Sequence, residues 1–401
     1  MDSVRRLSLQ EFVLLFASLI SLTALAIDIV LPAYPHFAQH FNADIQQDVP
    51  RVVTLFIFGM VFGELLFGPL SDAFGRKSAI VSGLFIFVLG SLVCMMATSL
   101  EWLWLGRILQ GIGVSGPKIG SRALIRDQYQ GDAMARVMSQ MMIIFILVPM
   151  VAPAIGQALL WVVPWQGLFV VLLVQAISAG TWLILRQPET LQPEKRIAFS
   201  LTNWWQSTQL FLRDFPVMAY TAVAGFTFGG QLIYLSLCQN IFFDVYGVSE
   251  WFPVYFAALA FAIGLASLVN SFLVMKLGMA VLALTSQGLL LLTSSLLLIW
   301  TVLFQVPGLF TFMIIAFVML FCVGLLFGNI NALAMQSLGR IAGVGASLIA
   351  AISSALAVLV SSLVGGFYQG SLVPLAFGFF LCSTVSLLLL WLANKRPVKE
   401  L

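Results

Sequence analysis

Long apolar stretches separated by short polar turns follow one another along almost the whole chain. A helix that crosses the hydrocarbon core of a bilayer needs about 20 consecutive, mostly apolar residues. The pattern therefore predicts twelve membrane-spanning helices in an all-α membrane protein. The predicted spans cover residues 11–35, 51–70, 78–99, 101–123, 135–159, 164–186, 215–239, 252–275, 279–302, 308–337, 341–367 and 371–393.

Composition supports this interpretation, because 61% of the 401 residues are hydrophobic and only 9% are charged. The mean hydropathy is +1.05. Soluble proteins average about 45–50% apolar and about 25% charged residues, and a soluble core of this size cannot bury so much apolar surface. The composition excludes a soluble enzyme, a disordered chain and a nucleic-acid-binding module. We therefore expect the chain to contact a lipid bilayer and no nucleic acid.

The widest polar gap in the pattern lies between Arg186 and Asp214, after the sixth span. Its content of proline and charged residues is typical of a loop in water. We therefore predict two pseudo-symmetric six-helix bundles, at residues 1–186 and 214–401, joined by a cytoplasmic linker at residues 187–213.

The positions of lysine and arginine predict the orientation of the spans, because these residues collect in cytoplasmic loops. If the chain starts inside, sixteen of its 19 lysine and arginine residues fall on the cytoplasmic side. Arg51 lies outside, and Arg107 and Lys118 lie within a span. We therefore expect both termini in the cytoplasm and a multi-pass protein of the cytoplasmic (inner) membrane.

A cleaved signal peptide is an alternative interpretation of the first span. Arg5 and Arg6, an apolar run and the small residues around Ala24–Ala26 satisfy its three regions. However, the apolar stretch continues to Pro35, which is long enough to span a membrane. The uncleaved interpretation is favoured.

The residue types that bind metals form no ligand set in this sequence. The four cysteines all lie inside apolar stretches and resemble small buried hydrophobic residues. His36 and His40 follow the first apolar stretch, and nothing near them completes a metal site. We expect no metal and no cofactor.

Four charged residues lie in the middle of predicted spans, where each costs at least ~2.5–3.5 kcal/mol. They are Asp28, Glu64, Arg107 and Lys118, all in the first half of the chain. Their depths along the helices predict an outer pair of Asp28 with Arg107 and a deeper pair of Glu64 with Lys118. Arg107 and Lys118 share one helix face, and Gln110 lies beside them.

Asp28 is the predicted proton carrier. Burial favours the neutral form of a carboxyl group, whereas a nearby guanidinium favours the charged form, so a carboxyl group under both influences can exchange a proton near neutral pH. Pro32 and Pro35 follow it and favour a bend in this helix. The alternative is a static ion pair that fixes the first span to the fourth. Glu64 is either a second coupling residue or a gate residue, and Lys118 is either a substrate anchor or the counter-ion of Glu64.

Further polar residues in the second half are candidates for lining a substrate cavity. Together with Lys118 and Gln110, the predicted substrate-binding set contains Gln231, Tyr234, Asn329 and Asn331. Each of them is equally typical of a hydrogen bond between helices, worth about 0.6 kcal/mol.

Several motifs occur in an order that resembles a known family. Residues 68–77, with Asp72, Gly75 and Arg76, resemble the G-x-L-x-D-x-x-G-R-[RK] loop of the major facilitator superfamily. Arg107 with residues 110–113 resembles the R-x-x-Q-G-x-G motif of its fourth helix. Residues 149–157 resemble the fifth-helix antiporter motif, with Ala152 where that motif usually begins with glycine. Residues 28–33 resemble the D-M-Y-L-P-A segment of its bicyclomycin-resistance (Bcr/CflA) branch of drug:H+ antiporters.

The resemblance implies two bundles that rock about a central cavity, with Asp28 carrying the coupled proton. It also implies a cytoplasmic gate, with Asp72, Arg76 and Asp127 as the latch. Gly75 would permit the tight turn, and Pro149 and Pro153 would belong to the gate helix. Glu64 stands where the family usually has glutamine, and Lys118 where it has a small residue. A cation at this depth favours anionic or zwitterionic cargo by Coulomb attraction.

The resulting hypothesis is a proton-coupled antiporter that exports a small molecule, either a drug or an anionic or zwitterionic metabolite such as a siderophore. We expect it to act as a monomer. Uptake by proton symport on the same fold is the alternative. An integral-membrane enzyme is disfavoured, because no nucleophile–base or metal-ligand cluster lies within a predicted span.

Overall fold

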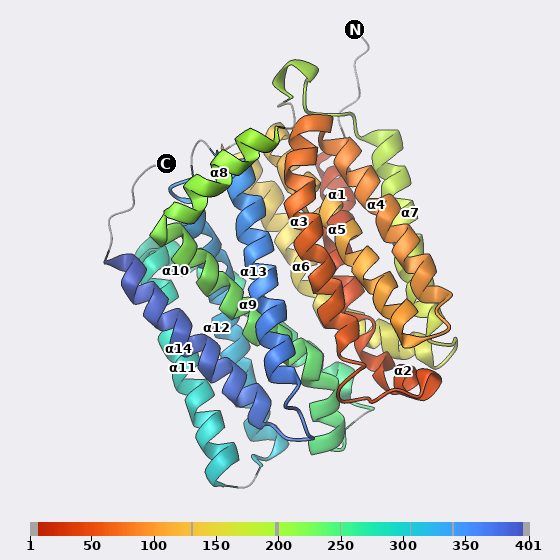
Figure 1. Ribbon diagram of the computed structural model, residues 1–401, viewed down its shortest axis with the longest axis vertical. Helices are drawn as coiled ribbons and strands as arrows, with labels where there is room; N and C mark the ends of the chain where they lie inside the picture. Colours follow the sequence, from red (N-terminus) through yellow and green to blue (C-terminus); the bar gives the residue numbers. More distant parts are fainter. Residues whose placement is uncertain are drawn as a thin grey trace. The chain divides into compact units, whose positions relative to one another are not determined.

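The computed structural model describes residues 7–129, 131–196, 200–248, 250–304, 306–338 and 341–395. Regular structure in these residues is helical (Figure 1). The first half contains α1 (Leu9–Asp28), α2 (Tyr34–Phe41), α3 (Arg51–Phe74), α4 (Arg76–Met95), α5 (Leu100–Gln128), α6 (Gly131–Leu160) and α7 (Gln166–Arg186). The second half contains α8 (Leu201–Arg213), α9 (Phe215–Asn240), α10 (Phe252–Leu277), α11 (Met279–Leu303), α12 (Leu309–Met335), α13 (Ala342–Gly365) and α14 (Val373–Asn394).

The long helices coincide with the predicted spans. Within the described residues, α1, α3 to α7 and α9 to α14 are each at least 20 residues long, and most begin and end within a few residues of a predicted span. Ten of the helical segments found there are long and apolar enough to cross a membrane. Helix α5 is not among the ten, and it carries the charges of Arg107 and Lys118. Helix α6 contributes a shorter apolar stretch, Leu147–Leu160.

The first predicted span is not one continuous helix. Helix α1 ends at Asp28, a 3-10 turn covers Leu31–Ala33, and α2 begins at Tyr34. Pro32 has no backbone N–H to donate, and proline also disfavours helical geometry in the residue before it. The predicted bend is therefore a complete interruption of the α-helix, and Asp28 is its last residue.

The linker contains a helix that the apolar pattern does not predict. Helix α8 occupies the second part of the polar stretch between α7 and α9. The side chain of Phe211 is buried, whereas those of Trp205 and Leu212 are exposed. At 13 residues this helix is too short to span a bilayer, so a search for long apolar stretches passes over it.

The chain divides into two compact units. One comprises Met1–Ala33 and Leu55–Trp204, and the other comprises Tyr34–Thr54 and Trp205–Leu401. The boundary inside the linker lies within the predicted 187–213, and the predicted domain ranges themselves stay a prediction. The chain also passes from one unit to the other between residues 33 and 34 and between residues 54 and 55. The apolar pattern does not predict these two boundaries.

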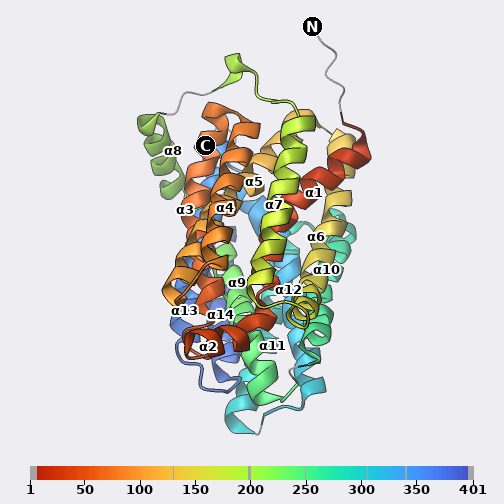
Figure 2. The same ribbon diagram turned by 90° about the vertical axis from the view of Figure 1, so that its right-hand side faces the viewer.

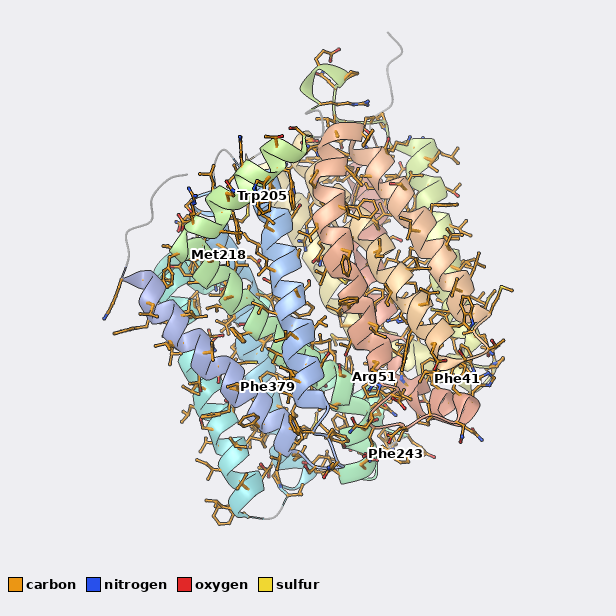
Figure 3. The ribbon with its side chains drawn as sticks, viewed as in Figure 1. Phe41, Arg51, Trp205, Met218, Phe243 and Phe379 are labelled. Atoms are coloured by element: carbon orange, nitrogen blue, oxygen red, sulfur yellow. The ribbon has the colours of Figure 1, made fainter. Side chains whose placement is uncertain are left out.

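Hydrogen bonds explain why the segment 34–54 belongs to the second unit. The Asn240 side chain donates to the Ile45 carbonyl over 3.0 Å, and the Gln47 side chain donates to the Tyr368 carbonyl over 3.0 Å. Gln46 Nε2 donates to Asp244 Oδ2 over 3.1 Å. We call this segment the strap. Within this unit, Arg51 and Phe243 lie at one end, and Trp205 and Met218 lie at the other (Figure 3).

Close helix packing organises each unit internally. In the first unit α4 runs along α5, and a Cβ atom on Gly116 would lie 2.6 Å from the Ala79 carbonyl oxygen, so only glycine fits. Helix α1 packs on α6 and α7 (Figure 2). In the second unit α9 packs against α12, α13 and α14. The close contact of α4 with α5 positions the helix that carries Arg107 and Lys118.

Candidate functional site

Asp28 is buried at the end of α1, with 4% of its surface exposed. The ion pairs identified among the described residues do not include Asp28 with Arg107, so that predicted pairing stays a prediction. Arg107 Nη2 donates to the Ala26 carbonyl over 3.0 Å. The last four carbonyls of a helix lack partners within the helix. Because α1 ends at Asp28, the Ala26 carbonyl is free to accept the hydrogen bond from the Arg107 guanidinium.

Arg107 is fully enclosed by groups that suit a guanidinium. Its Nη1 donates to Gln110 Oε1 over 2.8 Å, and its central carbon lies 4.4 Å from the ring centroid of Phe56, a cation–π contact. Gln110 Nε2 in turn donates to Ser91 Oγ over 2.8 Å. Gln110, predicted to bind substrate, is thus a buried partner of Arg107, and its substrate role stays a prediction.

Phe56 is a residue that sequence reasoning missed. Its ring lies beneath a buried guanidinium, but the chain contains 34 phenylalanines. The sequence provides no signal that separates Phe56 from rings that fill the core or face lipid.

Glu64 and Lys118 form the predicted deeper pair. Lys118 Nζ lies 2.5 Å from Glu64 Oε1. The Glu64 side chain is completely buried, and 20% of the Lys118 side chain is exposed. The pair joins α3 to α5, and Gly63 lets these helices approach so closely that a Cβ atom there would meet the side chain of Ser115. The structure thus confirms the pairing.

Arg76 is the centre of a charged cluster at the predicted cytoplasmic gate, the turn between α3 and α4. It forms an ion pair with Asp72, and its Nε lies 3.0 Å from Asp127 Oδ2 at the end of α5. Arg76 Nη1 also donates to Ser71 Oγ over 3.1 Å. Gly75 has φ of +105°, a conformation that favours glycine. The predicted latch residues therefore meet, and their role as a gate stays a prediction.

Glu189 completes this cluster, although the sequence analysis assigned it no role. Its Oε1 accepts the N–H of Arg76 over 2.9 Å, and its Oε2 accepts the N–H of Lys77 over 3.0 Å. These are the first two N–H groups of α4, so the carboxylate caps the positive end of that helix. The contact joins residues more than 110 positions apart, which local pattern analysis does not detect.

Helix α6 approaches the end of α1 near Asp28. A Cβ atom on Gly156 would collide with the Ile29 carbonyl, so glycine permits this approach. Pro153 is buried in the same helix and Pro149 is half-buried. The predicted gate prolines thus lie on the helix that packs against α1 and the residue after Asp28.

Most of the polar residues predicted in the second unit contact side chains of neighbouring helices or carbonyls of their own helix. Asn329 Nδ2 donates to Asn270 Oδ1 over 2.6 Å, a hydrogen bond between α12 and α10. Asn331 is exposed and donates to the Phe327 carbonyl. Tyr234 is buried with its ring stacked on Phe256, and Gln231 is half-buried on α9. The contact of Asn329 favours the interhelical interpretation, and the substrate-binding role of all four stays a prediction.

A search for metal ligands in the described parts of the chain finds no group of three or more histidine, cysteine, aspartate or glutamate residues that could hold an ion. His36 and His40 are both exposed on α2. The chemistry that the arrangement offers is the binding and release of protons and ions by side chains.

Comparison with known proteins extends these observations. The sequence model of the Major Facilitator Superfamily matches residues 15–362. The chain is 30% identical to the uncharacterized MFS-type transporter YdgK of Bacillus subtilis, over 96% of each protein. It is 29% identical to the bicyclomycin resistance protein homolog of Haemophilus influenzae, over 97% of each protein.

The fold also resembles solved structures. The crystal structure of a D-xylose–proton symporter superposes with a TM-score of 0.77 at 13% identity, over 97% of this chain and 98% of that chain. At this identity the resemblance establishes the fold alone. It confirms the predicted fold class.

Proposed function

Because the chain belongs to the major facilitator superfamily, we propose that it is an antiporter that exports a small molecule in exchange for protons. It is a multi-pass transporter of the inner membrane with relatives named for drug resistance. The observation that carries the proposal is Asp28, a carboxyl group buried at the point where α1 ends. Buried ionisable residues within membrane proteins are retained mainly where they move protons or bind cargo.

In the proposed mechanism Asp28 alternately binds and releases a proton. Arg107 holds the carbonyl of Ala26, two residues before Asp28, so the carboxyl group and the guanidinium act on the same end of α1. Protonation neutralises Asp28 at the end of α1 that Arg107 holds, and favours one arrangement of the transporter. Deprotonation restores the cargo-receptive arrangement. One proton moving through 100 mV releases ~2.3 kcal/mol, enough for about fifty-fold accumulation.

The cluster of Arg76 supports a gate on the side we assign to the cytoplasm. It joins α3, α4 and α5 through Asp72 and Asp127, and Glu189 connects it to the chain after α7. A movement that separates these helix ends must break several charge-assisted hydrogen bonds together, which gives the gate two distinct states.

The test uses purified protein in lipid vesicles with an imposed pH gradient and two cargoes, the carboxylate 2-naphthoate and the uncharged bicyclomycin, the drug in the name of one relative. We expect the gradient to drive accumulation of at least one of them against its concentration, and Asp28→Asn to abolish the dependence on the gradient. Glu101→Gln, at an exposed position, should leave it unchanged. Coupling that persists in Asp28→Asn contradicts the assignment.

The direction of flux separates antiport from the alternative, symport. In an antiporter a gradient that is acidic outside drives cargo out, whereas a symporter carries it in. The antiporter-like segment around Pro153 supports export. We also propose that the chain performs no covalent chemistry on its cargo and works as a monomer.

A further inference from the structure

A third charged residue accompanies the pair of Glu64 and Lys118. Arg122 lies four residues after Lys118 on α5, which places the two cations on the same helix face. The Glu64 carboxylate attracts the Arg122 guanidinium electrostatically. The cluster therefore contains two cations and one carboxylate, with a net charge of +1.

The ion pair is not needed to hold α3 against α5. Glycines already bring these helices into backbone contact at three levels, because Cβ atoms on Gly59, Gly63 and Gly111 would collide with atoms of the facing helix. A buried ion pair contributes little net stability compared with apolar packing, since both charges lose their water. Charges at this depth are also costly in a membrane. A purely structural role thus leaves their presence unexplained.

We propose that Lys118 and Arg122 are specificity-determining residues that receive one negatively charged group of the cargo. The inference rests on the proposed transport function and names the cargo class for this site, a small organic anion such as a carboxylate. Lys118, whose side chain is partly exposed, exchanges the Glu64 carboxylate for that of the cargo. Arg122 then balances the charge of Glu64.

The charge of the cluster explains the selectivity. A single anion makes the cluster neutral, so every buried charge has a counter-charge. A buried charge without a counter-charge would be strongly destabilising. A cationic cargo is repelled by the net positive charge. Arg107 does not compete for the anion, because it is fully buried and lies about 16 Å away along α5 at ~1.5 Å per residue.

The test uses the full-length purified protein and three probes of one shape: 2-naphthoate, the neutral 2-naphthamide and the cationic 2-naphthylmethylammonium. Binding is measured by calorimetry, and the melting temperature is followed because a bound ligand raises it. We expect 2-naphthoate to bind about tenfold or more tightly than either of the others, the value of one charge-assisted hydrogen bond.

The variants distinguish a binding role from a structural one. Lys118→Met should weaken 2-naphthoate binding about tenfold, and Lys118→Arg should retain it. Glu64→Gln should strengthen binding, because the competing carboxylate is gone. A structural pair predicts the opposite for Glu64→Gln, namely weaker binding together with a lower melting temperature. Arg126→Met, one turn further along α5 and also exposed, is the control.

Three outcomes overturn the proposal: no preference for the anion, unchanged binding in Lys118→Met, or weaker binding in folded Glu64→Gln. Proton coupling through Asp28 is measured in separate vesicle experiments. Loss of the anion preference with intact coupling rejects this site alone, whereas loss of coupling in the presence of anion binding rejects the proposed function alone.

Discussion

Arg107 shows how the partners of a single residue depend on where a neighbouring helix ends. The sequence identifies Arg107 as a buried cation because it interrupts an apolar stretch. It does not identify the acceptor, because the Ala26 carbonyl is available only when α1 ends at Asp28. By contrast, the pairing of Glu64 with Lys118, which was also predicted from depth, is confirmed by their contact.

At the same scale, Gln110→Leu tests the support of Arg107. The substitution keeps the approximate volume but removes the acceptor of Arg107 Nη1 and the donor to Ser91. We expect a loss of about 1–3 kcal/mol in stability, because buried polar groups lose their partners. The fall in melting temperature of the purified protein measures it. Gln128→Leu, at the exposed end of α5, should cause little change.

The positions of the helices were predictable because each follows from the length of an apolar stretch. The predicted span 215–239, for example, is observed as Phe215–Asn240. The interruption after Asp28 and the helix α8 were harder to predict from the sequence. The former depends on two prolines in an otherwise apolar run, and the latter on a short amphipathic pattern rather than on a continuous apolar one.

Pro32→Ala tests the interruption of α1. Alanine is favoured over proline by about 3 kcal/mol inside a helix, so the variant should extend α1 beyond Asp28. The carbonyl of Ala26 would then find a partner within the helix and Arg107 would lose its acceptor. We expect normal folding and at least about tenfold slower proton-coupled transport in vesicles. Pro216→Ala, where proline occupies the first turn of α9, should transport at the normal rate.

Glu189→Gln tests the cap of α4. Glutamine lacks the negative charge that both N–H groups of α4 face. The expected cost is about 1–2 kcal/mol in the free energy of unfolding, measured by thermal or denaturant unfolding. Glu194→Gln, an exposed position in the same linker, is the matched control. Equal stability of the two variants would contradict the capping role.

At the scale of the whole molecule, the strap connects parts of the chain that are far apart in sequence. Asp244 Oδ2 accepts hydrogen bonds from Gln46 and from the Tyr368 hydroxyl, which lies 3.2 Å away. Burial, and then the nearby carboxylate of Asp244, raises the pKa of Tyr368 well above its usual value. Tyr368 therefore keeps its proton, and remains a donor, throughout the physiological pH range.

Tyr368→Phe should loosen the strap through Asp244, because the lost hydroxyl donates to the carboxylate that accepts from Gln46. Loss of one hydrogen bond, about 1 kcal/mol, predicts roughly fivefold faster amide hydrogen exchange in residues 42–50. Exchange measured by mass spectrometry checks this. Tyr246→Phe removes a hydroxyl that donates to the Pro307 carbonyl elsewhere in the same unit, so it should leave the strap unchanged. Equal exchange rates of residues 42–50 in the two variants would show that the hydrogen bond from Tyr368 to Asp244 does not stabilise the strap.

The strap also has a consequence for biosynthesis. Ile45 leaves the ribosome 195 residues before Asn240, which later binds its carbonyl. At a synthesis rate of about 5–20 residues per second, Asn240 is made roughly 10–40 s after the strap. The second unit is therefore completed by a piece of chain made long before it. A polypeptide that starts after the linker has to insert with Asn240, Asp244 and Tyr368 lacking these docking partners.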